Sequence, residues 1–206
     1  MKPTALPVHE SLAILRTHQI PVAPFAIAAH AFELSHIQFG FPWVMKLSSN
    51  HFTHKTEQNA VRLHLHNRED ANAAFAELKK IDTHADIVVQ PQLSGTELFI
   101  GSTIDPQFGA TIVAGLGGIF VELLQDTSLR VLPIQKKDAL AMIAELKHPK
   151  LLRGFRGKPP VNPKEFAEII LKTAQMLEQN HFLELDINPL MATKKGIFAV
   201  DARIVK

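Results

Sequence analysis

Three glycines near the middle of the chain have the spacing of a phosphate-binding turn. Gly115, Gly117 and Gly118 lie between two short apolar runs in the segment GSTIDPQFGATIVAGLGGIFVE, residues 101–122. Because glycine has no Cβ, backbone N–H groups in such a turn can approach an anion closely. A glycine-rich turn is by itself a weak signal of phosphate binding, so its weight depends on residues elsewhere in the chain.

Other segments supply the remaining parts of a nucleotide site. Lys46 closes an apolar run, His54 lies in the polar loop 53–56, and carboxylates recur in the segment 184–201. A phosphate cradle, a cation, a nucleophile and metal ligands are the parts that phosphoryl transfer requires. Together they indicate nucleotide chemistry.

The carboxylate-rich segment has the pattern of a magnesium site. In ELDINP, Asp186 and Asn188 are two residues apart, so both project to one side of an extended chain while Ile187 points to the core. Asp201 also follows an apolar run and can lie on the neighbouring strand. Two carboxylates and an amide carbonyl are hard oxygen ligands that suit Mg²⁺. The alternative is that Asp186, Asn188 and Pro189 only end a strand in an Asx-type turn.

His54 has two interpretations. A neutral imidazole is a competent nucleophile toward a phosphoryl group, and Lys55 beside it can offset charge on the product. On spacing alone, a surface histidine is the more common outcome for one of eleven histidines. His51 lies three residues before His54, but a structural zinc site needs about four ligands. Since the chain has no cysteine, we do not expect zinc here.

Composition restricts the class of protein. Apolar residues make up 46% of the 206 residues, which is enough for a substantial core. With 22 basic and 20 acidic residues the formal net charge is +2, so we expect no nucleic-acid partner. No apolar run approaches the ~20 residues that span a bilayer, and the opening MKPTALPVHE lacks the apolar stretch of a signal peptide. We therefore expect a cytoplasmic protein with no membrane partner.

The elements that must position these residues form an α+β pattern. Apolar spacing predicts helices over 9–18, from Asn67 onward, 136–147 and 163–179. Apolar runs predict strands over 22–29, 42–47, 61–65, 86–90, 97–104, 120–124, 128–134, 182–187 and 197–204. Several neighbouring strands are hairpin-like, which favours α+β over a doubly wound parallel sheet.

Three segments make detailed structural predictions. The helix after Asn67 should bury Ala71, Ala74, Phe75 and Leu78. The helix 163–179 should begin with Asn162 as N-cap and Pro163 in its first turn, and bury Phe166, Ile169, Ile170 and Leu177. The run VRLHL predicts a half-buried strand in which Val61, Leu63 and Leu65 share the apolar face.

Seven segments, taken in order, resemble the ATP-grasp domain or subunit of ADP-forming acyl-CoA synthetases, which are relatives of succinyl-CoA synthetase. The resemblance runs from about Ser11 to Arg203 and is carried by FPWVMKLSS, HKTEQNAVRL, DPQFGATIVAGLGGIFVE, RVLPI, LLRGFRG, LDINPL and AVDARI. It implies an ATP-grasp fold of two lobes with the nucleotide site between them. On this basis residues 1–20 form an N-terminal helix and linker, 21–93 the first subdomain and 94–206 the second.

The resemblance also implies an activity. Relatives of this kind convert an acid, CoA and ATP reversibly to acyl-CoA, ADP and phosphate, and the phosphate travels on histidine. ATP/ADP and Mg²⁺ are the implied cofactors. No CoA-binding segment is evident in the sequence, so a CoA-binding domain or subunit is the implied partner.

Individual residues match positions with known roles in that family. His54 matches the histidine that accepts phosphate and delivers it to ADP, and Asp186 either joins the metal ligands or orients a histidine. Asn188 and Asp201 match the metal-binding positions. The matches to nucleotide contacts are Lys46, Glu97, Gly115, Gly117 and Gly118. Arg130 and Arg156 are candidate phosphate partners, although either can instead be a surface arginine in an ion pair worth about 0–1 kcal/mol.

Two departures from the family bear on these roles. The family commonly has two glycines where this chain has Asn59-Ala60, and the loss of both restricts a histidine loop that must swing between sites. Pro91 lies in the hinge where an acidic residue is common, and proline has no N–H to contact adenine.

Two functions are consistent with the sequence. In the first, the chain is the nucleotide-binding, phosphoryl-transferring part of an ADP-forming acyl-CoA, or acetyl-CoA, synthetase. In the second, it is a non-catalytic regulatory or scaffold ATP-grasp module of a multidomain, synthetase-like protein acetyltransferase. Retained Lys46, His54, Asn188 and Asp201 favour the first, whereas Asn59-Ala60 and Pro91 favour the second.

Overall fold

The structure is a computed structural model that describes residues 3–49, 60–118, 126–155 and 157–206. The chain divides into two compact units. The smaller unit consists of Ala5–Glu10 and Ala23–Gln92, and the larger unit consists of Met1–Thr4, Ser11–Val22 and Leu93–Lys206. Helix α1 (Val8–Thr17) begins in a segment of the smaller unit and ends in a segment of the larger one.

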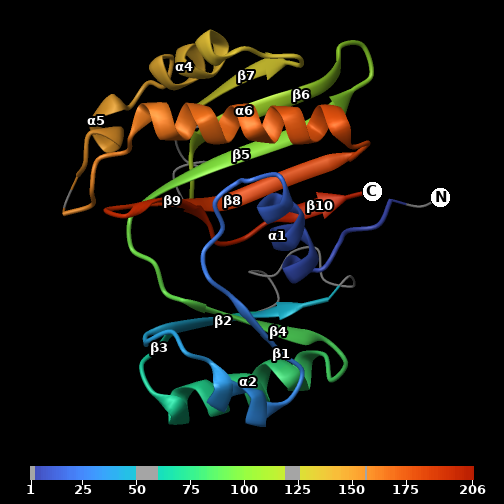
Figure 1. Ribbon diagram of the computed structural model, residues 1–206, viewed down its shortest axis with the longest axis vertical. Helices are drawn as coiled ribbons and strands as arrows, with labels where there is room; N and C mark the ends of the chain where they lie inside the picture. The colour runs from blue at the N-terminus through green and yellow to red at the C-terminus, as the bar shows by residue number, and fades with distance from the viewer. Residues whose placement is uncertain (1–2, 50–59, 119–125, 156) are drawn as a thin grey trace. The chain divides into compact units, whose positions relative to one another are not determined.

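An antiparallel sheet with the strand order β1-β4-β2-β3 forms the smaller unit. Helix α2 (Arg68–Ile81) lies along one face of this sheet, and the 3-10 helix η1 (Ala31–His36) packs beside α2 (Figure 1). The strands are β1 (Ala26–Ala28), β2 (Trp43–Ser48), β3 (Val61–Leu65) and β4 (Asp86–Pro91).

Helix α2 confirms the prediction made from its sequence. The side chain of Asn67 accepts a hydrogen bond from the Asp70 backbone N–H at 2.8 Å, which satisfies one of the free donors of the first turn. The buried face consists of the predicted Ala71, Ala74, Phe75 and Leu78. These residues pack in one core with Trp43, Met45, Leu47, Ile87 and Val89 of the sheet.

Strand β3 departs from the alternation that its sequence predicts, because Leu63 is 54% exposed. Trp43 pairs with Leu65 whereas Met45 pairs with Arg62, so β3 contains one extra residue between these pairs. Such a β-bulge changes which side chains face the core. His64 in the bulge has φ of 59°, a left-handed conformation that few residues other than glycine adopt.

The larger unit contains a six-stranded sheet with the order β10-β8-β5-β6-β7, in which β9 pairs with β8. The neighbouring strands described in this sheet all pair antiparallel, which confirms the α+β expectation. The strands are β5 (Thr96–Asp105), β6 (Gly109–Leu116), β7 (Thr127–Val131), β8 (Glu184–Thr193), β9 (Gly196–Ala199) and β10 (Arg203–Val205). The strand predicted over 120–124 lies outside the described residues.

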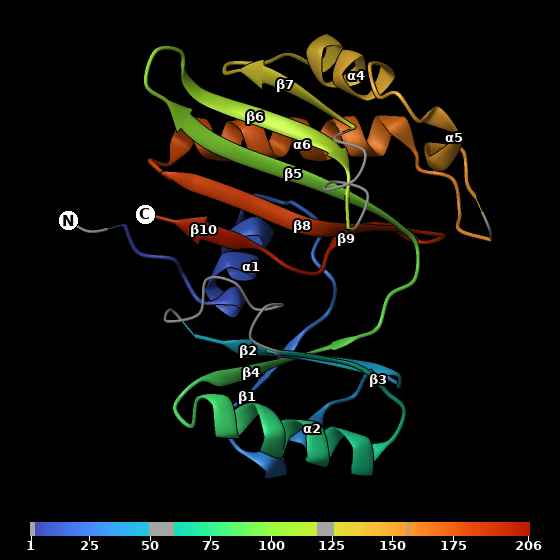
Figure 2. The same cartoon turned by 180° about the vertical axis from the view of Figure 1, so that it is seen from behind.

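Helices cover one face of this sheet. Figure 1 shows α6 (Pro163–Gln179) in front of β5 and β6, and Figure 2 shows it behind the same strands. Helix α4 (Lys136–Ala144) packs against α6, and the short α5 (Pro149–Leu152) follows it. Among the helices that the structure describes, none is both long and apolar enough to cross a membrane.

Helix α6 begins and ends at the predicted residues. Asn162 is its N-cap, because its side chain accepts hydrogen bonds from the N–H groups of Lys164 and Glu165 at 3.1 and 3.4 Å. Pro163 occupies the first turn, where its missing N–H costs nothing. The side chains that face the sheet and α4 include the predicted Phe166, Ile169, Ile170 and Leu177, all of them buried.

The two faces of the larger sheet carry different side chains. Residues 98, 100, 114 and 116 lie on one face and are almost fully buried apolar side chains. On strands, alternate residues point to opposite faces. Residues 99, 101, 113 and 115 therefore lie on the other face, where Phe99 and Val113 alternate with Gly101 and Gly115. Ser128 of β7 pairs with Ala114, so its side chain lies on the same face as Leu98 and Ile100. Ser128 Oγ also donates a hydrogen bond to Glu145 at the end of α4. The apolar face is therefore the one that the helices cover.

We expect the packing of α6 on this sheet to decide the stability of the larger unit. The Phe166→Ala substitution removes a fully buried ring and leaves a cavity, so it should lower the free energy of unfolding by about 3–5 kcal/mol. Chemical denaturation followed by circular dichroism measures this change.

Phe108→Ala is the matched control, because Phe108 is 66% exposed. It should leave the free energy of unfolding within about 0.5 kcal/mol of the parent value. Equal destabilisation by the two substitutions would contradict the position assigned to α6.

Candidate functional site

The register of β8 brings two of the predicted metal ligands together. Leu190 pairs with Ala199 of β9, and Asp186 pairs with Arg203 of β10. Asn188 lies midway between Asp186 and Leu190 on β8, and Asp201 lies midway between Ala199 and Arg203. Extending either pair by two residues therefore places Asn188 opposite Asp201. The two pairings therefore have the same offset on either side of the break between β9 and β10. The backbone hydrogen bond from Val200 N–H to the Pro189 carbonyl, 3.2 Å, belongs to this register.

Asp186 lies on the same face as Asn188, as the two-residue spacing predicts. Ile187 between them is fully buried, whereas Asp186 and Asn188 are half-buried. Asp201 is also half-buried, and its Oδ1 accepts a hydrogen bond from the Ala202 N–H at 2.8 Å. The side chains of Asp186 and Asn188 thus project from the sheet face that the helices leave uncovered.

The pairing of β8 with β5 is irregular beside Asn188. Leu98 pairs with Leu190 and Ile100 pairs with Ile187, so β8 has one more residue than β5 between these pairs. Such a bulge re-aims side chains and interrupts the hydrogen-bonded ladder. It falls at Asn188 and Pro189, the two residues of β8 that lie between these pairs.

The predicted metal ligands form a small oxygen-donor set. Two of them are carboxylates and the third is an amide. In the described part of the chain there is no cluster of three or more His, Cys, Asp or Glu side chains with the geometry of a metal site. The donor set is instead two carboxylates and one carbonyl oxygen, which is what Mg²⁺ accepts when waters or phosphates complete its shell.

At two of the three glycine positions, backbone packing alone requires a glycine, without any ligand. A Cβ on Gly117 would lie 2.6 Å from the Leu98 carbonyl oxygen, closer than real Cβ atoms approach. A Cβ on Gly115 would collide with the Asp126 carbonyl oxygen. Gly115 is also part of β6, so the strand continues through it and the turn begins later than the sequence indicates.

Glu97 holds the end of the glycine segment. Its backbone carbonyl accepts the Gly117 N–H at 2.7 Å, so this N–H belongs to the sheet. Its carboxylate occupies the space that a Cβ on Gly118 would need, and Gly118 has φ of 63°. Lys158 Nζ lies 3.9 Å from Glu97 Oε1. The predicted phosphate contact is therefore best sought at Gly118 and the residues after it, and residues 119–125 lie outside the described part of the chain.

Arg130 lies on the helix-covered face, away from Asp186 and Asn188. It pairs across the sheet with Ile112, and Ile112 is fully buried. The guanidinium donates hydrogen bonds to Glu145 and to Ser128 Oγ, the second at 3.1 Å. The bond to Glu145 raises the pKa of Arg130, and the bonds from Arg130 and then Ser128 lower the pKa of the Glu145 carboxyl.

Lys46 occupies the centre of β2 in the smaller unit. It pairs with Val88 on one side and Val61 on the other, and it is only 5% exposed. Met45 and Leu47 belong to the core under α2, so Lys46 points to the opposite face of this sheet. A lysine is rarely buried without a counter-charge or a functional reason.

Gln90 is a buried polar residue that the sequence analysis did not single out. It pairs with Val44 on β4 and so shares a sheet face with Lys46. Its side chain is 1% exposed, and both its amide oxygen and its amide nitrogen lack a hydrogen-bond partner among the described residues. A buried amide with no partner costs free energy unless a ligand or water satisfies it. A glutamine inside an apolar strand next to the Pro91 hinge was the only sequence signal.

Several predicted residues lie outside the described part of the chain. They are His54, Asn59 and Arg156. Ala60 is described, and it is fully buried in the core under α2 while its carbonyl accepts the Leu47 N–H at 2.9 Å. Packing therefore explains why a side chain is present at position 60.

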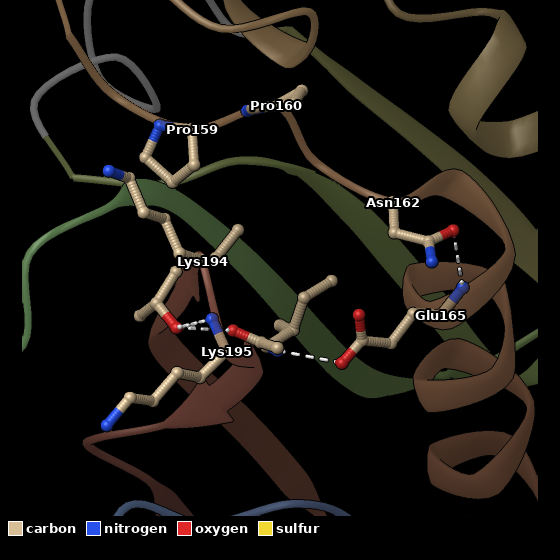
Figure 3. Close-up of a pocket in the computed structure, with 10 residues that line it drawn as sticks. Pro159, Pro160, Asn162, Glu165, Lys194 and Lys195 are labelled. Carbon is tan, nitrogen blue, oxygen red and sulfur yellow. Dashed lines mark hydrogen bonds between the residues drawn. The ribbon is translucent and has the colours of Figure 1, made fainter.

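A separate hollow of about 490 Å³ lies between the start of α6 and the β8–β9 turn (Figure 3). Glu165 closes one side, because its Oε1 accepts the Ile197 N–H at 2.8 Å. Lys194 and Lys195 project at the other side. None of the predicted site residues lines this hollow.

The position of Arg130 gives a direct test. Arg130→Gln should leave nucleotide affinity unchanged, because the side chain points into the helix-covered face and is bound to Glu145. It should lower stability at neutral pH. Since the folded-state pKa of Glu145 is lowered, this stabilisation is present above the ordinary carboxyl pKa and is lost as the pH falls through the folded value.

Thermal unfolding of parent and variant from pH 7 down to pH 3 measures the effect. The difference in melting temperature should shrink as the pH falls. A loss of nucleotide affinity with no pH-dependent change in stability would mean that Arg130 acts as a phosphate contact.

Comparison with known proteins supplies a family for this arrangement. A family model described as ATP-grasp domain matches residues 2–205. The chain is 39% identical over 207 residues to the beta subunit of an ADP-forming acetate–CoA ligase I from Pyrococcus furiosus, covering 95% of this chain and 89% of the relative. It is 34% identical to an ADP-forming acetate–CoA ligase I from Archaeoglobus fulgidus, of which it spans 30%.

A solved structure has the same fold. It is an acetyl-coenzyme A synthetase 1 from Ca. Korarchaeum cryptofilum, with a TM-score of 0.83, 37% sequence identity, and coverage of 98% of this chain and 92% of that one. That protein was solved with coenzyme A and Mg-AMPPCP, with its phosphohistidine segment pointing towards the nucleotide-binding site.

Proposed function

Because this chain belongs to the ATP-grasp domain family, we propose that it is the nucleotide-handling part of an ADP-forming acyl-CoA synthetase. In this role it binds ATP or ADP and transfers a phosphoryl group reversibly between the nucleotide and a histidine. The observation that supports the proposal is that Leu190 pairs with Ala199 and Asp186 pairs with Arg203 at the same offset, from which we infer that Asn188 lies opposite Asp201. The likeness to an ADP-forming acetate–CoA ligase beta subunit over nearly its whole length supports it.

Lys46 and Gln90 are the proposed nucleotide contacts of the smaller unit. Lys46 is buried on a strand whose backbone is paired on both sides, so its ammonium group is held in place for a phosphate. Gln90 offers a donor and an acceptor from one amide, and neither has a partner among the described residues. An amide of this kind can bond to the edge of a nucleobase through two hydrogen bonds.

Asp186, Asn188 and Asp201 fit a magnesium ion. Their oxygens are hard ligands, and the half-buried position leaves space for the waters and phosphate oxygens that Mg²⁺ prefers to keep. When bound, the ion would neutralise charge on the phosphates during transfer. The Korarchaeum relative was solved with Mg-AMPPCP, which supports this choice of metal.

His54 is the proposed phosphoryl carrier. The bond between the γ-phosphorus and the oxygen of the ADP leaving group breaks as a bond between that phosphorus and an imidazole nitrogen forms. ADP leaves with the electron pair of the broken bond, and the reverse step regenerates ATP. The Korarchaeum relative was solved with a phosphohistidine segment pointing towards its nucleotide-binding site, which supports a histidine carrier.

A CoA-binding partner completes the proposed reaction. The Pyrococcus relative is named a beta subunit, and the Archaeoglobus relative is more than three times as long as the part this chain matches. The acid and CoA sites are therefore assigned to a second subunit or to further domains.

A labelling experiment tests the proposal. Incubation of the purified chain with Mg²⁺ and γ-labelled ATP should leave acid-labile label on the parent protein, whereas His54→Ala should carry none. The variant should still bind Mg-ADP with nearly unchanged affinity, because the histidine acts on the transferred group. No label on either protein, with the partner subunit added, would favour the non-catalytic regulatory or scaffold alternative.

Asp201 tests the metal assignment. Asp201→Ala removes one of the proposed carboxylate ligands, so it should weaken Mg-ADP binding by about tenfold or more, measured by calorimetry. Binding of ADP measured with EDTA in place of Mg²⁺ should change far less. Equal affinity of parent and variant for Mg-ADP would count against the metal site.

A further inference from the structure

Arg203 lies within the proposed phosphoryl site, and the sequence analysis gave it no role. It is the first residue of β10 and pairs directly with Asp186 on β8. Side chains of directly opposite residues lie on the same face of a sheet, with Cβ atoms about 4.5–5.5 Å apart. Arg203 therefore shares a face with Asp186 and follows Asp201 by two residues.

Among the described residues, Glu184 is the side chain that bonds to the Arg203 guanidinium. Nη1 donates to Glu184 Oε1 at 2.7 Å, and the two side chains are 30% and 45% exposed. Nε is buried and has no hydrogen-bond partner among the described residues. A buried N–H without an acceptor costs about 1–3 kcal/mol, so such groups usually have an acceptor that the structure does not contain.

The remaining donors have the geometry of an oxyanion receptor. A guanidinium presents Nε–H and one Nη2–H as two parallel donors, which match two oxygens of a phosphate or a carboxylate. The Glu184 carboxylate holds the other end of the group, so the free pair of donors has a fixed direction. A lysine at this position would act only as a point charge and would not offer two parallel donors.

We propose that Arg203 binds the phosphoryl group that is being transferred, through its Nε–H and Nη2–H. This inference rests on the proposed function. Arg203 keeps its protons throughout and forms no covalent bond. Its donors contact non-bridging oxygens of the group that moves between the nucleotide and the histidine.

Charge supports a phosphoryl ligand at this position. Glu184, Asp186 and Asp201 contribute three negative charges on this part of the sheet, and Arg203 contributes one positive charge. A magnesium ion held by Asp186 and Asp201 would offset two of the negative charges. The guanidinium, with its buried donors, then provides the directional contact that stabilises charge spread over the phosphoryl oxygens.

The competing explanation is structural. In that case Arg203 only ties β10 to β8 through Glu184, and its loss would disturb Asp186 and every ligand of the site alike. The two explanations differ in which nucleotide they affect, because ADP lacks the γ-phosphoryl group.

The experiment compares Mg-ADP with Mg-AMPPCP, which keeps a γ-phosphoryl group and is not hydrolysed. Calorimetry on the 206-residue chain gives both affinities for the parent, Arg203→Gln and Arg203→Lys. Arg203→Gln should weaken Mg-AMPPCP binding by about tenfold to a hundredfold and leave Mg-ADP within about twofold, as expected for loss of a charge-assisted hydrogen bond. Arg203→Lys keeps the charge and should show a smaller loss with the same selectivity.

Two control variants isolate the contact. Glu184→Gln removes the ion pair that orients the guanidinium but leaves its donors in place, so Mg-AMPPCP affinity should fall less than in Arg203→Gln, with Mg-ADP affinity again unchanged. Arg62→Gln breaks another Arg–Glu pair, the 2.8 Å pair with Glu77 on the smaller unit, and should change neither affinity. Circular dichroism checks that each variant is folded. If Arg203→Gln does not fold, the two affinities of Arg203→Lys are compared with those of the parent instead.

Each outcome is decisive. Equal losses for both nucleotides, or no loss for either, overturn the phosphoryl contact while leaving the proposed function intact. A parent chain that binds neither nucleotide overturns the proposed function itself.

Discussion

The pairing of β8 is the constraint on which the rest of the candidate site depends. This strand is bonded to β5 on one side and to both β9 and β10 on the other, and it keeps one register against the last two. A register shift of a single residue would move every side chain of the partner to the opposite face. The juxtaposition of Asn188 with Asp201, and of Asp186 with Arg203, is therefore a property of the whole sheet. The irregular pairing with β5 occurs at the same place, where β9 has ended and β10 has not yet begun.

The larger sheet separates stability from chemistry by its two faces. One face packs under α4 and α6 and is made of apolar side chains that are almost fully buried. The other carries Asp186 and Arg203, and on β5 and β6 it carries Gly101 and Gly115 beside Phe99 and Val113. Because alternate residues of a strand face opposite ways, one sequence can specify a core and a binding surface at once. Arg130 shows the consequence. It is a basic residue in a family motif, but its position in the alternation of β7 directs its side chain toward α4 and Glu145.

Close packing and ligand binding make overlapping demands on glycine. Gly115 and Gly117 have no room for a Cβ against neighbouring backbone, and Gly118 adopts a left-handed conformation beside the Glu97 carboxylate. From sequence, a glycine-rich segment predicts a phosphate-binding turn. Here Gly115 and Gly117 also allow β6 to pack closely against β5 and against the residues before β7. The same distinction applies to Ala60, whose methyl group is buried in the core under α2. Composition of a loop alone does not separate these two causes.

The sequence by itself determined the local elements and the class of fold. Helix caps at Asn67 and Asn162, and apolar residues at helical spacing, predicted α2 and α6 together with their buried faces, because capping and amphipathic spacing are local properties. The seven family segments indicated an ATP-grasp fold, which the match over residues 2–205 confirms. Tertiary structure alone decided the rest. It set the bulge that exposes Leu63 and the face on which Arg130 lies. It also set the pairing of Arg203 with Asp186 and the burial of the Gln90 amide, which has no hydrogen-bond partner among the described residues. Each of these depends on which strands are neighbours and in what register, and residues far apart in the chain fix that register only when the sheet has formed.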